Sequence, residues 1–229
     1  MSRFGYSAFR IKGNQVATPA KFSVPGDMST AAAIIGATVA AAGSSELAGI
    51  NSKFPQSDAA IISIARKFGA SIRETNTSLL VKCRSTKSPE LEFDLKESPD
   101  IVPVVAGVAA ALGRRVKISN VGHLRFKESD RLSVLSRELR KLGVQTKETL
   151  SSLSVLSSGS KHIRKPILIN PERDHRMLMA LAIAGLSGRY GEIIIRDPDC
   201  VRKSYPTFVK DLQKLCDEKK TVRIVEVFR

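Results

Sequence analysis

Three stretches of this chain are apolar on every side rather than along one stripe, and an aspartate precedes each of them. The stretches cover residues 28–42, 101–112 and 177–186, and the aspartates are Asp27, Asp100 and Asp174. Asp is a favourable N-cap residue, so each aspartate is expected to begin a helix. A helix without a polar face must be buried. The aspartates lie 73 and 74 residues apart, and this spacing indicates a repeated unit.

The segments between the apolar helices follow a common order. A β-rich stretch comes after each helix, at 45–50, 115–121 and 192–197, and a second helix follows. That second helix is clearest in the middle copy, where leucines recur at helical spacing from Leu132 to Leu142. Closing strands are expected at 70–81, 144–155 and, in a shorter third copy, 222–227. The residues suited to end the apolar helices are Gly43, Gly113 and Gly188.

The sequence therefore predicts an α/β (α+β) fold of three repeated β-α-β-α-β-β units packed around buried helices. One apolar helix cannot be covered by the few strands of its own unit, so the three units should pack together. We expect them at about 27–95, 96–160 and 161–229. Residues 1–26 stand outside the pattern, with a strand at 7–11, a turn at 13–15 and a segment at 20–24. The chain is expected to start in the middle of something larger.

Composition limits the class of protein. Of 229 residues, 42% are hydrophobic, which is enough for a core and too much for a disordered chain. No apolar run reaches the roughly 18 residues of a membrane span, and the start has no signal-peptide pattern. The cysteines Cys83, Cys200 and Cys216 form no C-x-x-C pair, so neither a disulfide framework nor a zinc site is indicated. We expect a soluble, cytoplasmic protein.

The formal net charge is +15, from 37 Lys and Arg against 22 Asp and Glu. Such an excess favours nucleic-acid binding in general. Here the aromatic content is only 5% with no Trp, so bases have little to stack on, and the basic residues are spread along the chain. The charge indicates either a solvated basic surface or a site for small, multiply anionic ligands.

Three ionic clusters stand where strands lead into helices, at 125–131, 173–177 and 202–206. The first two have a plain structural explanation, because Ser129 or Asp130 could cap one helix and Asp174 another. A threefold arrangement would nevertheless gather the clusters at one end of the domain. Four cations and two carboxylates would then meet in what would be a group-transfer site: Lys127, Arg131, Arg176, Lys203, Asp100 and Glu128.

Four strings along the chain resemble the 5-enolpyruvylshikimate-3-phosphate synthase family. They are V-P-G-D-M-S-T-A-A at 24–32, K-E-S-D-R at 127–131, D-H-R-M at 174–177 and P-D-C-V-R-K-S-Y-P at 198–206. They occur in the family's order, and the resemblance extends from about Phe4 to Leu215. It implies one lobe of the two-lobed enolpyruvyl transferase fold. It also implies transfer of the enolpyruvyl group of phosphoenolpyruvate to the 5-hydroxyl of shikimate 3-phosphate, releasing phosphate, without metal or organic cofactor.

The resemblance assigns roles residue by residue. Asp100 matches the carboxylate that contacts the shikimate hydroxyls and accepts a proton, and Glu128 matches the carboxyl group proposed to protonate the methylene carbon of phosphoenolpyruvate. Lys127 matches a shikimate 3-phosphate ligand and a partner in proton transfer. The phosphoenolpyruvate ligands are Arg131, Arg176 and Lys203. Because Glu128 must carry a proton at one stage, some desolvation of its carboxyl group is expected.

Two departures from the family pattern stand out. His123 occupies a position where many members have an Asn that contacts shikimate 3-phosphate. The motifs of the family's other lobe are absent, so residues 1–26 would be the last strands of that lobe and the crossover, and 27–229 the C-terminal lobe. We therefore expect the isolated chain, a monomer, to be inactive or nearly so without its N-terminal lobe. Two alternatives remain: a transferase acting on UDP-N-acetylglucosamine, and a basic module that binds RNA.

Overall fold

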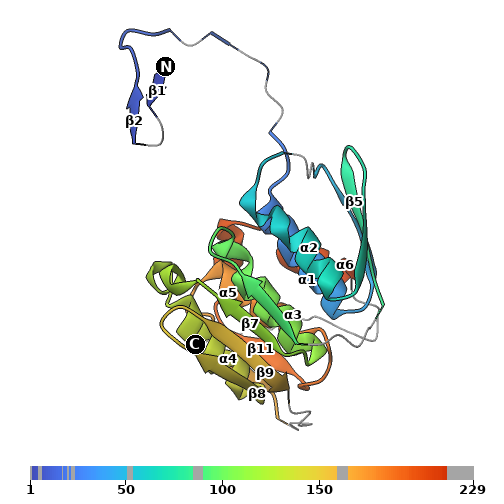
Figure 1. Cartoon of the computed structure of the whole chain (residues 1–229). Coiled ribbons are helices and arrows are strands. Elements are labelled where there is room, and N and C mark those ends of the chain that lie inside the picture. Colours follow the sequence, from blue (N-terminus) through green and yellow to red (C-terminus); the bar gives the residue numbers. More distant parts are fainter. Residues whose placement is uncertain are drawn as a thin grey trace.

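Three helices form the centre of the computed structural model, which describes residues 2–4, 7–16, 18–19, 21, 24–50, 54–84, 90–158 and 165–215. The central helices are α1 Met28–Ala40, α3 Val102–Leu112 and α5 His175–Gly185. They pack against one another, and the two larger sheets lie on different sides of them (Figure 1). Nearly every residue of these helices is buried, as their uniformly apolar sequences predict. No helix in the described ranges is long and apolar enough to span a membrane.

The first sheet has three antiparallel strands in the order β3-β5-β4. The strands are β3 Ser44–Ala48, β4 Ala70–Glu74 and β5 Ser78–Cys83, and helix α2 Ala60–Lys67 lies between β3 and β4 in the sequence. The short turn η1 Ser57–Ala59 leads into α2. These elements agree with the strands and the helix predicted between residues 45 and 81.

The second sheet has four strands in the order β6-β7-β9-β8, and β6 and β7 are parallel. The strands are β6 Leu91–Asp94, β7 Val116–Ser119, β8 Val144–Glu148 and β9 Leu153–Ser158. Helix α4 Arg131–Lys141 lies between β7 and β8 in the sequence. Helix α3 is the crossover between the two parallel strands. This segment has the full β-α-β-α-β-β order expected of one unit.

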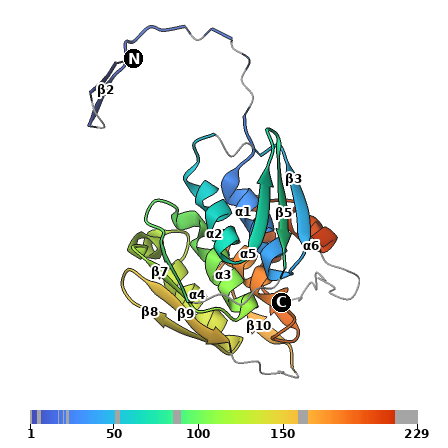
Figure 2. The same cartoon turned by 45° about the vertical axis from the view of Figure 1, so that its right-hand side comes forward.

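The third group begins in the same way, with β10 Ile167–Ile169 and β11 Ile193–Ile195 parallel and joined through α5. Helix α6 Phe208–Leu215 follows. The predicted strand at 222–227 lies outside the described residues, as does most of the segment at 20–24. A hairpin of β1 Ser2–Phe4 and β2 Ala8–Arg10 stands away from the body of the protein (Figure 2). The boundaries of the repeats and of the first 26 residues remain predictions.

The three aspartates do not play the same part. The side chains of Asp27 and Asp174 accept hydrogen bonds from backbone amides in the first turns of α1 and α5, as predicted. The prediction that Asp100 caps α3 is wrong. Pro99 opens a 3₁₀ turn, η2 Pro99–Ile101, so the helix begins beyond Asp100 and has no side-chain cap. The carboxylate of Asp100 is therefore available for other partners.

The helix ends also differ in detail. Gly113 adopts the left-handed conformation at the end of α3, with φ 66°, as expected for a C-terminal glycine. Gly188 has φ 67° in the turn after α5. Gly43 does not end α1 in this way, because Ala42 takes the positive φ of 53° instead.

A close crossing of α3 and α5 leads to a stability prediction. A Cβ atom at Gly107 would overlap the carbonyl oxygen of Ala180, which belongs to backbone and cannot move aside. Gly107→Ala should therefore push the two central helices apart and destabilise the fold by about 1–3 kcal/mol. Urea unfolding measures the change. Gly43→Ala is the control, because nothing lies within 4 Å of a Cβ there; equal stability of both variants would contradict the close crossing.

Candidate active site

The charged residues predicted to meet do lie together, at the ends of elements from different parts of the chain. Asp100 lies on η2, and Lys127 and Glu128 lie between the turn η3 Gly122–Phe126 and α4. Arg131 opens α4 and Arg176 stands in the first turn of α5. The last member, Lys203, ends the turn η4 Pro198–Lys203.

Asp100 is held by three cations. One carboxylate oxygen lies 3.0 Å from Nη1 of Arg131 and 3.7 Å from Nζ of Lys127, and the other lies 3.1 Å from Nη2 of Arg176. Nη1 of Arg176 also donates to the backbone carbonyl of Asp100 at 3.1 Å. This carboxylate does not cap a helix, and within the described residues its ion-pair partners are Lys127, Arg131 and Arg176 of the candidate site.

Arg131, one of these three cations, is buried. Its side chain is only 1% exposed, and besides Asp100 it pairs with Glu128 at 2.6 Å and with Asp174 at 2.8 Å. The side chain of Asp174 is completely buried and accepts a further hydrogen bond from Oγ of Ser129 at 3.1 Å. The sequence identified Asp174 only as a helix cap, whereas the structure makes it a third carboxylate of the cluster.

Glu128 lies between two cations, Arg131 and Lys203, whose Nζ is 3.1 Å from the carboxylate. Partial burial by itself would raise the pKa of Glu128, as the sequence led us to expect. A backbone hydrogen bond, the hydrogen bond from Lys203 and the charge of Arg131 outweigh that effect and lower the pKa to about 2. With these partners the carboxyl group of Glu128 is ionised at neutral pH.

Among the described residues, His123 and Asp58 stand apart from the ion pairs of this cluster. His123 is exposed on η3, and within the described part of the chain no hydrogen bond or ion pair joins its side chain to the cluster. Asp58, which the sequence did not single out, is buried on η1 and accepts a hydrogen bond from Oγ of Ser29. Burial raises the pKa of Asp58, and the charge of Asp100 acts in the same direction. The repeat spacing could have identified Asp58 from the sequence. This residue follows Asp27 by 31 residues, and Asp130 follows Asp100 by 30.

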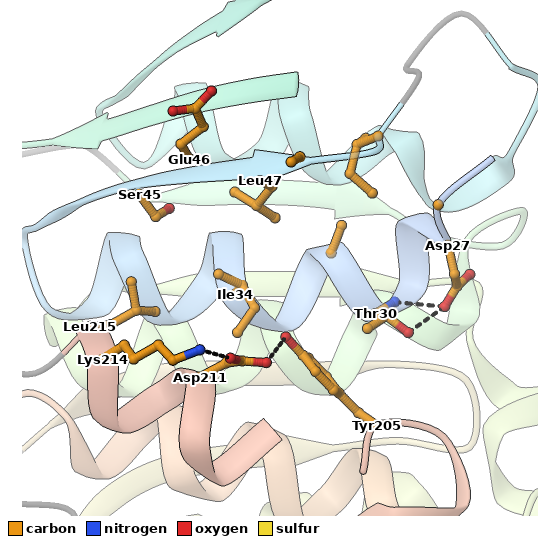
Figure 3. A pocket seen from close by; sticks show the side chains of 14 residues that line it. Asp27, Thr30, Ile34, Ser45, Glu46, Leu47, Tyr205, Asp211, Lys214 and Leu215 are labelled. Carbon is orange, nitrogen blue, oxygen red and sulfur yellow. Dashed lines mark hydrogen bonds and ion pairs between the residues drawn. The ribbon is translucent and has the colours of Figure 1, made fainter. Parts of the chain in front are cut away.

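A separate cavity of about 550 Å³ lies between α1, β3 and α6 (Figure 3). Ile34, Leu47 and other apolar side chains line much of it. Three of its polar groups partner one another, because Asp211 accepts hydrogen bonds from Tyr205 at 3.2 Å and from Lys214 at 2.9 Å. The cavity therefore has no cluster of charge comparable with that around Asp100.

The chemistry available to the cluster follows from its balance of charge. Four cations, Lys127, Arg131, Arg176 and Lys203, surround the carboxylates of Asp100, Glu128 and Asp174. An anionic ligand would compete with these carboxylates for the cations and leave a carboxylate free to exchange protons. In the described ranges no three His, Cys, Asp or Glu side chains are grouped as metal ligands.

Two solved structures resemble this chain in fold. The EPSP synthase of Acinetobacter baumannii matches with a TM-score of 0.68 and 23% identity, over 84% of this chain and 46% of that one. The enolpyruvyl transferase NikO of Streptomyces tendae matches with a TM-score of 0.62 and 18% identity, over 84% and 43% of the two chains. The likeness shows that the chain has the enolpyruvyl transferase fold, as predicted.

The family follows from sequence. The family model described as EPSP synthase (3-phosphoshikimate 1-carboxyvinyltransferase) matches residues 4–212, so the chain belongs to this family. Among curated relatives with that enzyme name, the protein of Methanopyrus kandleri is 36% identical over 93% of this chain and 49% of its own length. The protein of Pyrococcus abyssi is 34% identical over 94% and 50%. The chain thus spans about half the length of the curated relatives it matches.

Proposed function

We propose that this chain contributes the acid–base and anion-binding residues of a 3-phosphoshikimate 1-carboxyvinyltransferase. The observation that carries the proposal is the shared binding of Asp100 and Glu128 by one buried guanidinium, that of Arg131. Two carboxyl groups held at one place in unlike surroundings can divide the tasks of proton donor and proton acceptor. Membership of the family supports this reaction over RNA binding, and the enzyme name of the relatives favours it over transfer to a UDP-sugar.

The proposed reaction has two steps that use the same groups in opposite directions. The 5-hydroxyl oxygen of shikimate 3-phosphate bonds to C2 of phosphoenolpyruvate while the hydroxyl loses its proton and the methylene carbon gains one. The tetrahedral intermediate then loses phosphate as its C–O bond breaks and the new methyl group returns a proton. We assign the hydroxyl proton to Asp100 with Lys127, and the carbon-bound proton to Glu128.

Ligand binding would change the protonation of the Glu128 carboxyl group. Arg131 is inaccessible behind its own carboxylates, so a ligand carboxylate or phosphate reaches it only by displacing one of them. Glu128 and Asp100 are similarly exposed, at 35% and 31%. Glu128 is bound by two cations, Arg131 and Lys203, whereas Asp100 is bound by three, so Glu128 is the one we propose to be displaced. When the ligand takes these cations, the pKa of Glu128 rises from about 2, and the group becomes able to hold the proton it delivers.

The reaction would also need groups that lie outside this chain. The remaining half of the relatives' length would supply the other contacts to both substrates, so the chain alone should be nearly inactive. We assign no step to a metal, an organic cofactor or a second copy of the chain, and we treat the protein as a monomer. His123 is assigned a rim contact to shikimate 3-phosphate. The low cysteine content is compatible with the proposed location in the cytoplasm.

Titration of the chain with phosphoenolpyruvate tests the proposal. Amide signals of Asp100, Arg176 and Lys203 should shift in NMR spectra. Arg176→Met should weaken binding about 10- to 100-fold, the effect of losing a charge-assisted contact. Arg202→Met is the matched control, because Arg202 is 75% exposed and its ion pair among the described residues is with Asp199, three positions earlier. Equal binding by both variants would contradict the assigned site.

Calorimetry tests the proposed change at Glu128. Titrations in buffers of different ionisation enthalpy should show that phosphoenolpyruvate binding takes up protons in the native chain, since the pKa of Glu128 rises. Glu128→Gln should show less uptake. Binding with no net proton uptake at any pH between about 3 and 6 would contradict the exchange of Glu128 for the ligand.

A further inference from the structure

One buried carboxylate lies outside the candidate active site and takes no part in the chemistry above. Glu138 stands in the middle of α4, and its side chain is 0% exposed. It accepts hydrogen bonds from Nε of Arg137 at 2.8 Å, from Nζ of Lys141 at 2.7 Å and from the backbone amide of Asn170 at 3.0 Å. Burial alone would raise the pKa of Glu138, but these three donors lower it. The group is an ionised carboxylate, and both of its oxygens accept hydrogen bonds.

The bond to Asn170 holds the start of an unusual turn. Glu172 and Arg173 have φ of 54° and 57°, and non-glycine residues in this left-handed region cost about 1–2 kcal/mol each. Such a conformation persists only where its surroundings impose it. The amide of Glu172 donates to Oδ1 of Asn170 at 3.0 Å, and Arg137 bonds the side chain of Glu172 at 2.8 Å. Helix α4 therefore contacts this turn at Asn170, through Glu138, and at Glu172, through Arg137.

The turn leads directly into the candidate active site. Its next residue is Asp174, which caps α5 and binds Arg131, and two residues further Arg176 reaches Asp100. Arg131 and Glu138 lie seven residues apart on α4, so they share one face of that helix. One helix thus contacts the entrance of α5 at two points, through Arg131 and through Glu138.

We propose that Glu138 is a positioning residue, which fixes the turn at 170–174 against α4 and thereby aligns Asp174 and Arg176 with Arg131 for binding a carboxylate or phosphate group. The inference rests on the proposed function, because the aligned groups are those assigned to phosphoenolpyruvate. It goes beyond that function in naming a residue with no ligand contact whose loss should weaken ligand binding.

The test compares Glu138→Ala and Glu138→Gln with a control on the same helix, Ser136→Ala. Ser136 is buried and its hydroxyl bonds Thr146 on β8, away from the turn. Two readouts are needed: amide hydrogen exchange at Asn170 and Asp174, and phosphoenolpyruvate affinity by NMR titration. Glu138→Ala should speed exchange and weaken binding, each by about tenfold or more. Glu138→Gln should lie between it and the native chain, since it keeps one acceptor for the Asn170 amide.

The outcomes separate the two proposals. If Glu138→Ala does not fold, Glu138→Gln carries the comparison by itself. Native exchange at the turn and native affinity in a folded Glu138 variant would overturn the positioning role. So would an equal loss in Ser136→Ala, because the effect would then come from general destabilisation of α4. If the native chain does not bind phosphoenolpyruvate, the proposed function fails, while exchange at Asn170 and Asp174 still decides whether Glu138 holds the turn.

Discussion

Arg131→Met is expected to lower the free energy of unfolding by about 3–5 kcal/mol, the cost of leaving a buried carboxylate without its partner. Methionine fills a similar volume, so the loss is of charge and hydrogen bonds rather than of packing. Asp174 is 0% exposed, and of its side-chain bonds within the described residues those to Ser129 and to the first turn of α5 would remain. Asp100 and Glu128 would also lose a shared cation.

Chemical denaturation of the native chain and of Arg131→Met measures the change in the free energy of unfolding. Arg202→Met is again the control, because an ion pair whose side chains are 75% and 83% exposed contributes at most about 1 kcal/mol. A loss in Arg131→Met no larger than in the control would mean that Asp174 is not a buried, ionised partner. Restoring stability with a second change, Asp174→Asn, would support the pairing, since the double variant buries no unpaired charge.

The dependence of stability on pH gives a second view of this cluster. The pKa of Glu128 is about 2 in the folded chain and near 4.5 when unperturbed. A carboxyl group with a depressed folded pKa stabilises the fold above its unfolded pKa, and that contribution is lost as the pH falls through the folded value. The native chain should therefore lose stability between about pH 4.5 and pH 2. Arg131→Met should lose less over the same interval, because Arg131 is one source of the depression.

Much of this fold could be predicted from sequence because its signals are local. An Ala-rich run such as that of α1 has no polar face, so burial follows directly. The even spacing of Asp27, Asp100 and Asp174 then placed the following junctions at one end, which brings Asp100 to Arg131 and Arg176 in space. Helix ends were predicted less well. Pro99 favours a 3₁₀ turn that moves the start of α3 past Asp100, and the sequence offers no rule for choosing between a cap and a shifted start.

The burial of charge could not be predicted in the same way. On α4, Glu138 and Lys141 read as an ordinary exposed pair three residues apart, yet Glu138 is 0% exposed and accepts a hydrogen bond from Asn170, more than thirty residues later. Arg131 likewise reads as part of a charged loop. Its burial depends on Asp174, which reaches it only through the packing of α5 against α4. Long-range contacts of this kind decide which charges are solvated, and no local pattern records them.

Asp100→Asn should lower turnover about 10²- to 10⁴-fold in a complete enzyme, the range of general acid–base contributions. Asparagine keeps the size of the side chain and one acceptor oxygen for Arg131 or Arg176, but it cannot take a proton from the substrate hydroxyl. A suitable enzyme is a chimaera in which this chain replaces the corresponding half of the Methanopyrus kandleri relative, which it matches over 49% of that protein's length. Phosphate release measures turnover.

The control for this variant is Asp94→Asn in the same chimaera. Asp94 is exposed at the end of β6, where it bonds Asn120 and the amide of Lys96 rather than the cluster. Both substitutions remove one negative charge, so a general effect of net charge would appear in both. If Asp100→Asn retains the turnover of the parent chimaera, Asp100 is a binding group and the proton acceptor is another residue. If only the KM values rise, its three cation contacts serve substrate affinity alone. A fall in turnover with little change in KM is the result that the proton-acceptor assignment requires.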